Sequence, residues 1–227
     1  MISPVSENAL LITLAEEIRS DLPGQLSSLC KHLNAQQWSW LVDLVPAYTT
    51  LLVVYDQQQL DFRQATAAIR PFLTPERLNA GEIRVPGSSE ALELPVYYST
   101  ESGPDLQALA NACSLSTDQV IQQHTADTYQ VFAMGFAPGF AFMGEVDKSI
   151  AHPRHKTPRK HVPAGSVGIA NRQTAVYPVS SPGGWQIIGR CPTRLFDPAR
   201  LSLLAIGDRV RFRSISRQQY LQLGGRF

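Results

Sequence analysis

The sequence predicts two domains, an α+β domain over residues 1–90 followed by a mainly-β domain over residues 91–227. Charge differs between the two regions: residues 1–91 hold 10 acidic and 6 basic residues, whereas residues 92–227 hold 9 acidic and 14 basic residues. Residues 135–207 hold 9 of the 15 glycines and 8 of the 16 prolines, so this part of the chain is rich in turns. Proline, glycine and serine also gather at residues 86–89, which are the best candidate for a linker.

The first region alternates strand and helix patterns. Short apolar runs predict strands at residues 9–14, 38–45, 49–55 and 83–85, the middle two forming a hairpin. Apolar residues at helical spacing predict helices over residues 23–33 and 62–73, and Pro75 is expected to end the second helix. The resulting order β-α-β-β-α-β predicts a ferredoxin-like domain.

The second region begins with a predicted strand at residues 92–98 and two predicted helices at residues 104–113 and 116–124. Ser116 and Gln119 have the spacing of a capping box at the start of the second helix. Short β-like runs, separated by Gly/Pro turns, then predict a β-barrel or sandwich. These runs lie at residues 129–134, 166–170, 175–179, 185–188 and 209–213, and a last helix is expected at 216–223.

Composition excludes several classes of protein. The net charge is +1 and no polybasic segment occurs, so we expect no nucleic-acid partner. No stretch approaches the roughly 20 apolar residues of a membrane span, and the first residues lack the basic start of a secretory signal. Cys30, Cys113 and Cys191 show neither metal-ligand spacing nor a disulfide framework. We therefore expect a cytoplasmic protein with reduced thiols and no membrane partner.

Residues 132–144 interleave glycine with phenylalanine. Phe136 and Phe140 lie close to Gly135 and Gly139, which allow positive φ and close backbone approach. One interpretation is a core strand that runs into a tight turn. The other is a loop whose aromatic rings face a ligand. The spacing matches neither a P-loop nor a dinucleotide-binding motif.

Residues 151–163 contain four Lys/Arg, three histidines, three prolines and no acid. The prolines stiffen the backbone, so we expect a loop that presents Arg154 and Arg159 for bidentate binding of a carboxylate or phosphate. The alternative is a solvated basic loop. The histidines have no acidic or cysteine neighbours at ligand spacing, so no metal site is predicted.

Other residues in this region have more than one interpretation. Ser166 lacks the setting of a nucleophile elbow, which favours a hydrogen-bonding turn residue. Gln173 and Thr174 either bind an amide or carboxylate or belong to a surface turn. Trp185 is either a core residue or a ligand platform, and Asp197 is either a turn cap, a partner of an arginine or a base.

Together these segments resemble the family that comprises the B subunit of 5-oxoprolinase (PxpB), KipI and allophanate hydrolase subunit 1. The matching text is GFAPGFAFMG, two Pro-Arg pairs, VPAGSVGIA, QTAVYP, SPGGWQIIG and LFDP, between about residues 95 and 213. The resemblance implies that a cyclophilin-like β-barrel follows the ferredoxin-like domain. It also implies ATP-dependent ring opening of 5-oxo-L-proline to L-glutamate. The implied partners are the A subunit of 5-oxoprolinase and its C subunit, which is similar to allophanate hydrolase subunit 2.

The resemblance also implies roles for individual residues. Arg154 and Arg159 are the catalytic candidates, aimed at phosphoryl oxygens of the activated substrate. The candidates for binding the cyclic amide are Phe136, Phe140, Ser166, Gln173, Thr174 and Tyr177. ATP with magnesium is the expected cofactor, with no metal ligands identified in this chain. We expect the chain to be inactive without its partners.

Two departures from the family pattern bear on the substrate. The family loop usually reads GFxPGFPYLG, whereas Ala141, Phe142 and Met143 stand here in place of Pro-Tyr-Leu, and Ala175 replaces a glycine. Two alternatives therefore stay open beside the oxoprolinase: a KipI-like inhibitor of a sensor histidine kinase, and an allophanate hydrolase or urea amidolyase subunit 1.

Overall fold

The structure is a computed structural model that describes residues 1–79, 91–199 and 201–227. The chain divides into two compact units, Met1–Gly87 and Ser88–Phe227. Each unit has its own apolar core. The predicted linker at residues 86–89 and the predicted strand at residues 83–85 lie outside the described residues. Within the described ranges, no helix has the length and apolar character that crossing a membrane requires.

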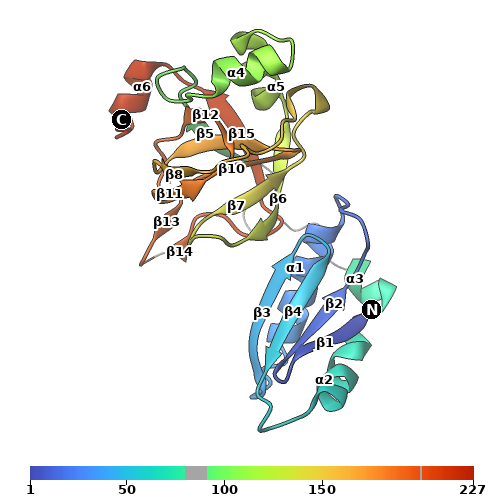
Figure 1. Ribbon diagram of the computed structural model, residues 1–227. Coiled ribbons are helices and arrows are strands. Elements are labelled where there is room, and N and C mark those ends of the chain that lie inside the picture. The colour runs from blue at the N-terminus through green and yellow to red at the C-terminus, as the bar shows by residue number, and fades with distance from the viewer. Residues whose placement is uncertain (80–90, 200) are drawn as a thin grey trace. The chain divides into compact units, whose positions relative to one another are not determined.

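Unit 1 is built on antiparallel strands in the order β1-β2-β4-β3 (Figure 1). They are β1 (Ile2–Ser6), β2 (Ala9–Thr13), β3 (Leu41–Ala47) and β4 (Thr50–Tyr55). Strands β2 and β3 are both antiparallel to β4, which lies between them, and α1 (Leu22–Asn34) connects β2 to β3. The predicted hairpin at residues 38–45 and 49–55 is present as β3 and β4.

Helix α1 packs its apolar face on this sheet. Leu26, Leu29 and Leu33 recur at helical spacing and pack with Leu51 and Val53 of β4 in one buried cluster. The sequence did not predict β1, because its side chains are mostly exposed and therefore leave no apolar alternation to detect.

The predicted helix at residues 62–73 is divided into two pieces. These are α2 (Phe62–Ile69), which begins with a capping box between Asp61 and Gln64, and η1 (Arg70–Phe72). Pro75 does not simply end this segment but begins α3 (Pro75–Asn79). Proline is favoured at a first helical position, because it has no backbone N–H to leave unpaired there.

Unit 2 contains a mostly antiparallel sheet in the order β5-β15-β6-β7-β10-β9-β12. The strands are β5 (Leu92–Val96), β6 (Thr128–Met134), β7 (Ala141–Gly144), β9 (Ser166–Ala170), β10 (Gln173–Val176), β12 (Gln186–Arg190) and β15 (Arg209–Ser214). Tyr97, directly after β5, exchanges two backbone hydrogen bonds with Arg190 at the end of β12. These bonds join the two ends of the sheet, which therefore closes into a barrel, one of the two architectures predicted.

Side chains alternate between the inside and the outside of the barrel, as the period of a strand requires. Val167, Ile169 and Val176 point inward into the larger core cluster. Helices α4 (Leu106–Ala112) and α5 (Thr117–Ala126) add buried apolar side chains to the same cluster. The predicted capping box of Ser116 and Gln119 is present at the start of α5.

The outer face of β9, β10 and β12 carries a second apolar cluster. Its members include Ala170, Ala175 and Ile187, with Phe140 and Val162 brought in from other segments. Val162 belongs to β8 (Arg159–Val162), which pairs with β11 (Ser181–Gly183) in a separate two-stranded sheet.

The sequence predicts a loop at residues 151–163, which β8 corrects in part, and it does not predict β11. Strand β8 is short and mostly polar, and β11 contains Pro-Gly, so neither shows a strand pattern. Four short elements complete the unit: η2 (Lys148–Ile150), β13 (Phe196–Asp197), β14 (Leu201–Ser202) and α6 (Arg217–Gln222).

Candidate functional site

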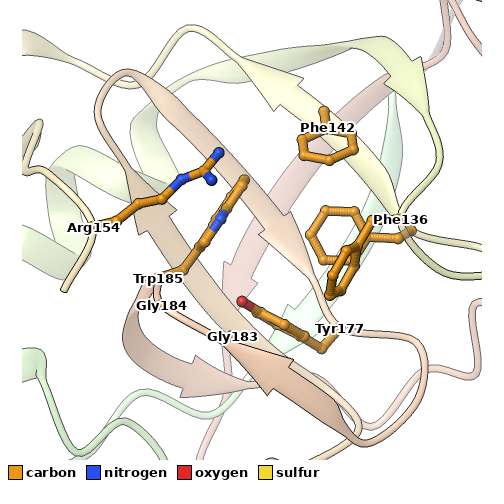
Figure 2. A pocket seen from close by; sticks show the side chains of 8 residues that line it. Phe136, Phe142, Arg154, Tyr177, Gly183, Gly184 and Trp185 are labelled. Carbon is orange, nitrogen blue, oxygen red and sulfur yellow. The ribbon is translucent and has the colours of Figure 1, made fainter. Parts of the chain in front are cut away.

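A small pocket lies against the second apolar cluster, on the outer face of the barrel. Its volume is about 120 Å³. Figure 2 shows Arg154 lying along Trp185 on one side of the pocket, with Phe136 and Phe142 on the other side. The lining residues are Phe136, Phe140, Phe142, Arg154, Tyr177, Gly183, Gly184 and Trp185.

The loop between β6 and β7 supplies the phenylalanine side of the pocket. Gly139 holds this loop in a left-handed conformation with a φ of +82°, and a Cβ there would lie 2.8 Å from the Cβ of Phe196. Only glycine meets both conditions. The segment at residues 132–144 is therefore a hairpin whose strands belong to the barrel and whose loop faces the pocket. It combines the two interpretations that the sequence leaves open.

The two predicted phenylalanines occupy different depths. Phe140 is 1% exposed and makes edge contacts with Tyr177 and Trp185, at centroid distances of 5.2 and 5.7 Å. Phe136 is 64% exposed and stands edge-on to Phe140 at 5.2 Å. Phe140 therefore forms the floor of the pocket, and Phe136 forms part of its rim.

Tyr177 lines the pocket beside the β11 backbone. Its hydroxyl oxygen lies next to the backbone at Gly183, in β11. A Cβ on Gly183 would lie 2.4 Å from that oxygen, so the ring can approach only because residue 183 is glycine. Burial raises the pKa of Tyr177. The nearby charges of Arg154 and Arg159 lower the pKa, but by less than burial raises it. The hydroxyl therefore stays protonated at neutral pH and can act as a hydrogen-bond donor.

Arg154 is the positive charge of the pocket. Its guanidinium carbon lies 5.8 Å from the centre of the Trp185 ring, within the range of a cation–π contact. Arg154 forms no ion pair with any residue in the described part of the chain. Its charge is therefore available to an anionic ligand.

Arg159 does not line the pocket. Its guanidinium pairs with the carboxylate of Asp105, a residue whose side chain is only 7% exposed. The same carboxylate lies 3.3 Å from Nε2 of His155 and accepts a hydrogen bond of 2.7 Å from the backbone N–H of Ile187. The two arginines that the sequence groups together thus have different surroundings.

Three predicted binding residues lie away from the pocket lining. Thr174 is fully buried inside the barrel, where its Oγ1 donates to the carbonyl of Gly168 at 3.1 Å. Ser166 is also fully buried, at the first position of β9. Gln173 begins β10 and pairs across to Ala170, with its side chain partly exposed. Of the predicted site residues, the pocket thus brings together Phe136, Phe140, Arg154 and Tyr177.

Sequence reasoning does not select four residues of the lining: Phe142, Trp185, Gly183 and Gly184. Trp185 is 5% exposed and belongs to the second apolar cluster, as the core interpretation predicts, and its ring also lines the pocket. Its position directly after Pro-Gly-Gly is the available signal. Phe142 stands out in the sequence only as a departure from the family pattern. Asp105 gives no signal at all, because nothing in the sequence near residue 105 indicates that it meets residues 155 and 159.

The pocket does not fit ATP with magnesium. Its volume of about 120 Å³ lies well below the roughly 300–1,000 Å³ of pockets that hold drug-sized ligands. No carboxylate lines it, although magnesium is bound through carboxylates and phosphates. Among the residues that the structure describes, no cluster of three or more His, Cys, Asp or Glu side chains could hold a metal ion.

Known proteins of similar sequence agree with the resemblance carried by the motifs. Residues 1–205 match the family model for the carboxyltransferase domain, subdomain C and D. The chain is 38% identical over 226 residues to the 5-oxoprolinase B subunit of Bacillus subtilis (strain 168), covering 96% of this chain and 94% of that protein. It is 48% identical over 126 residues to the 5-oxoprolinase B subunit of Escherichia coli O157:H7, covering 55% of this chain and 58% of that protein.

A solved structure has a similar fold. The crystal structure of TTHA0988 is similar with a TM-score of 0.79 and 32% sequence identity. The match covers 93% of this chain but only 40% of that longer chain. On the family model and on the identity over nearly its whole length to a curated relative, this chain belongs to the family of 5-oxoprolinase B subunits, within the carboxyltransferase subdomain C and D proteins.

Proposed function

We propose that this chain is the B subunit of an ATP-dependent 5-oxoprolinase, a hydrolase that converts 5-oxo-L-proline to L-glutamate. Relatives over most of the chain are named as B subunits of 5-oxoprolinase, which implies further subunits. We propose the A and C subunits as these partners, a cytoplasmic location, and no activity without the partners. The proposal includes a ferredoxin-like fold for unit 1 and a cyclophilin-like fold for unit 2.

The observation that carries the proposal is the chemistry of the pocket. Its volume of about 120 Å³ suits a small molecule, and aromatic rings form most of its walls. The guanidinium of Arg154, which no described carboxylate pairs, stands at its side. 5-Oxo-L-proline combines the matching features, since it is a small, nearly flat lactam ring that carries one carboxylate.

Each group of the pocket then has a defined task. The guanidinium of Arg154 pairs with the substrate carboxylate and so fixes its orientation. The rings of Phe136, Phe140 and Trp185 enclose the lactam ring and exclude water from it. The protonated hydroxyl of Tyr177 supplies a neutral donor for an oxygen of the substrate.

The ATP site lies outside this pocket in the proposed complex. Because the pocket fits neither the size of ATP nor the ligand preference of magnesium, we propose that ATP and magnesium bind outside it, in the complex with the A and C subunits. In that arrangement Arg154 binds substrate, and Arg159 supports the pocket wall through Asp105 instead of contacting a phosphoryl group.

The experiment is to co-express the chain with the A and C subunits, purify the complex and measure ADP and glutamate formed from 5-oxo-L-proline. We expect turnover that depends on all three subunits. Arg154→Ala should raise the KM for 5-oxo-L-proline by about 10²-fold, as loss of a charge-assisted bond predicts. Arg213→Ala is a matched control, because Arg213 pairs with Glu93 away from the pocket.

Absence of turnover with all three subunits present would refute the proposal. Turnover of allophanate or urea by the same complex would instead favour the amidolyase alternative. Reduced autophosphorylation of a sensor kinase in the presence of the isolated chain would favour the KipI-like alternative.

A further inference from the structure

We propose that Asp105 is the positioning residue of the pocket: it holds the loop that carries Arg154 against the segment that carries Trp185. The inference rests on the proposed function, because it assumes that the pair formed by Arg154 and Trp185 binds the substrate. Asp105 lies almost 50 residues before Arg154 in the sequence and outside the pocket lining.

The carboxylate of Asp105 joins three segments of unit 2. One oxygen accepts a hydrogen bond from Arg159 at the start of β8. The other accepts from the backbone N–H of Ile187 in β12 at 2.7 Å and lies 3.3 Å from Nε2 of His155. The backbone of Asp105 also donates to the carbonyl of Ile187 at 2.9 Å, so the residue is fixed to β12 from two sides.

The same region shows how this anchoring reaches Arg154. Its two sequence neighbours are each bonded to a sequence neighbour of Trp185. Pro153 accepts a hydrogen bond of 2.8 Å from the side chain of Gln186, and the backbone N–H of His155 donates to the carbonyl of Gly184 at 2.7 Å. These two hydrogen bonds fix the segment around Arg154 to the segment around Trp185. Figure 2 shows the Arg154 and Trp185 side chains lying next to each other.

Asp105 also contacts the segment that follows Arg154, at His155 and Arg159. His155 and Arg159 are partly exposed, with side chains 33% and 32% accessible, whereas the Asp105 side chain is 7% accessible. A buried carboxylate needs partners, and the Arg159 guanidinium and the backbone N–H of Ile187 supply them, with the His155 ring beside them. Asp105 therefore fixes both ends of the segment 155–159 and takes up the charge of Arg159. Arg154, which pairs with no described carboxylate, can then bind the carboxylate of a ligand.

The first test is a double-mutant cycle that needs no ligand. The ring resonances of Trp185 are recorded by NMR in the wild-type chain, Asp105→Asn, Arg154→Ala and the double variant. Asparagine still accepts from Ile187 but presents an amide to Arg159, so the loop loses its ionic anchor. We expect Asp105→Asn and Arg154→Ala to shift the Trp185 resonances in the same direction, and the double variant to match Arg154→Ala alone. Additive shifts would refute the inference.

The second test measures 5-oxo-L-proline binding by calorimetry, in the complex with the A and C subunits. Asp105→Asn should weaken binding about 10-fold, the size expected for loss of an orienting partner. In the Arg154→Ala background the same substitution should change binding less than about 2-fold, because its effect passes through Arg154. Equal losses in both backgrounds would contradict positioning.

One control variant tests whether the effect is specific to Asp105. Glu101→Gln removes another carboxylate of unit 2 from its ion pair with Arg217, and it should change neither the Trp185 resonances nor binding. If the wild-type complex does not bind 5-oxo-L-proline at all, the proposed function fails, whereas the ligand-free NMR cycle still decides whether Asp105 positions Arg154. If Asp105→Asn fails to fold, Arg159→Gln, which removes the same ion pair from the loop side, takes its place in both cycles.

Discussion

The hydroxyl oxygen of Thr174 lies 2.8 Å from Nε2 of His124, inside the barrel of unit 2. Thr174 donates its own proton to the carbonyl of Gly168 at 3.1 Å, so it must accept the proton of His124 Nε2. The other ring nitrogen of His124 then accepts from the hydroxyl of Tyr98 at 2.7 Å. This chain of bonds ties helix α5 to strand β10 and gives Thr174 a structural task.

Thr174→Val should therefore destabilise the fold without altering the pocket directly. Valine has nearly the same shape, but it leaves the buried Nε2 proton of His124 without an acceptor, which costs about 1–3 kcal/mol. Urea unfolding measures the change in the free energy of unfolding. The exposed Thr100 is the control, and Thr100→Val should change stability by less than about 0.5 kcal/mol. A neutral Thr174→Val variant with weakened substrate binding would show that Thr174 contacts substrate after all.

Acid should weaken unit 2 through His124. Burial lowers the pKa of His124 to about 3, while the unfolded chain takes up this proton near its ordinary value of about 6.5. Between these two values the unfolded state binds one more proton than the folded state. The free energy of unfolding should therefore fall as the pH falls, by up to about 1.4 kcal/mol per pH unit below 6.5.

Two measurements check this pH dependence. Urea unfolding at pH 7 and pH 5 gives the loss of stability, and NMR titration of the His124 ring shows directly whether it stays neutral in the folded chain. A His124 ring that takes up a proton near pH 6.5 while the chain stays folded would contradict the prediction.

Gly183→Ala should impair the pocket, while Gly184→Ala should be tolerated. A Cβ at residue 183 would lie 2.4 Å from the Tyr177 hydroxyl oxygen, so the ring must move. At residue 184 the nearest atom would be the carbonyl oxygen of His155 at 3.6 Å, which is ordinary contact. Overpacking of this kind costs about 1–3 kcal/mol, and we expect 5-oxo-L-proline binding to weaken about 10-fold in Gly183→Ala only. Equal behaviour of the two variants in calorimetry would count against the pocket geometry.

Phe136→Ala should weaken substrate binding with little change in stability. The side chain is 64% exposed, so truncation removes little buried surface, and the melting temperature should stay nearly constant. A loss of about 1–1.5 kcal/mol in binding, or roughly 10-fold, is expected for one aromatic wall. Leu223→Ala, at a residue 53% exposed on the C-terminal side of α6, is the control and should leave binding unchanged. Unaltered binding in Phe136→Ala would remove this ring from the site.

Much of the fold is predictable because it follows from local patterns. The leucines of α1, the capping box of Ser116 and Gln119, and the β3–β4 hairpin all depend on residues close together in the sequence. Elements without such a pattern escape prediction. Strand β1 is exposed, and β8 and β11 are short segments that pair only because the chain returns to them after about 20 residues.

The site is predictable only in part. The alternation of side chains along a strand explains why the predicted residue Thr174 lies away from the pocket. Tyr177 follows Thr174 by three positions, so in extended chain the two side chains point to opposite faces of the sheet. Tyr177 packs in the outer cluster with Ala175, whereas Thr174 faces the interior beside Val176. The sequence shows that Thr174 and Tyr177 lie on opposite faces of the strand, but it does not show which face carries the pocket.

By itself the sequence determined the two-region organisation, the family and the residue types of the site: glycines beside phenylalanines, and arginines in a proline-stiffened loop. Only the tertiary structure decided which of the two arginines is available to a ligand. Arg159 is paired because Asp105, more than 50 residues earlier, lies beside it once the barrel closes, whereas the guanidinium of Arg154 lies over Trp185 instead. A charge is neutralised by whatever lies within a few ångströms in space, and distance along the chain does not reveal that neighbour.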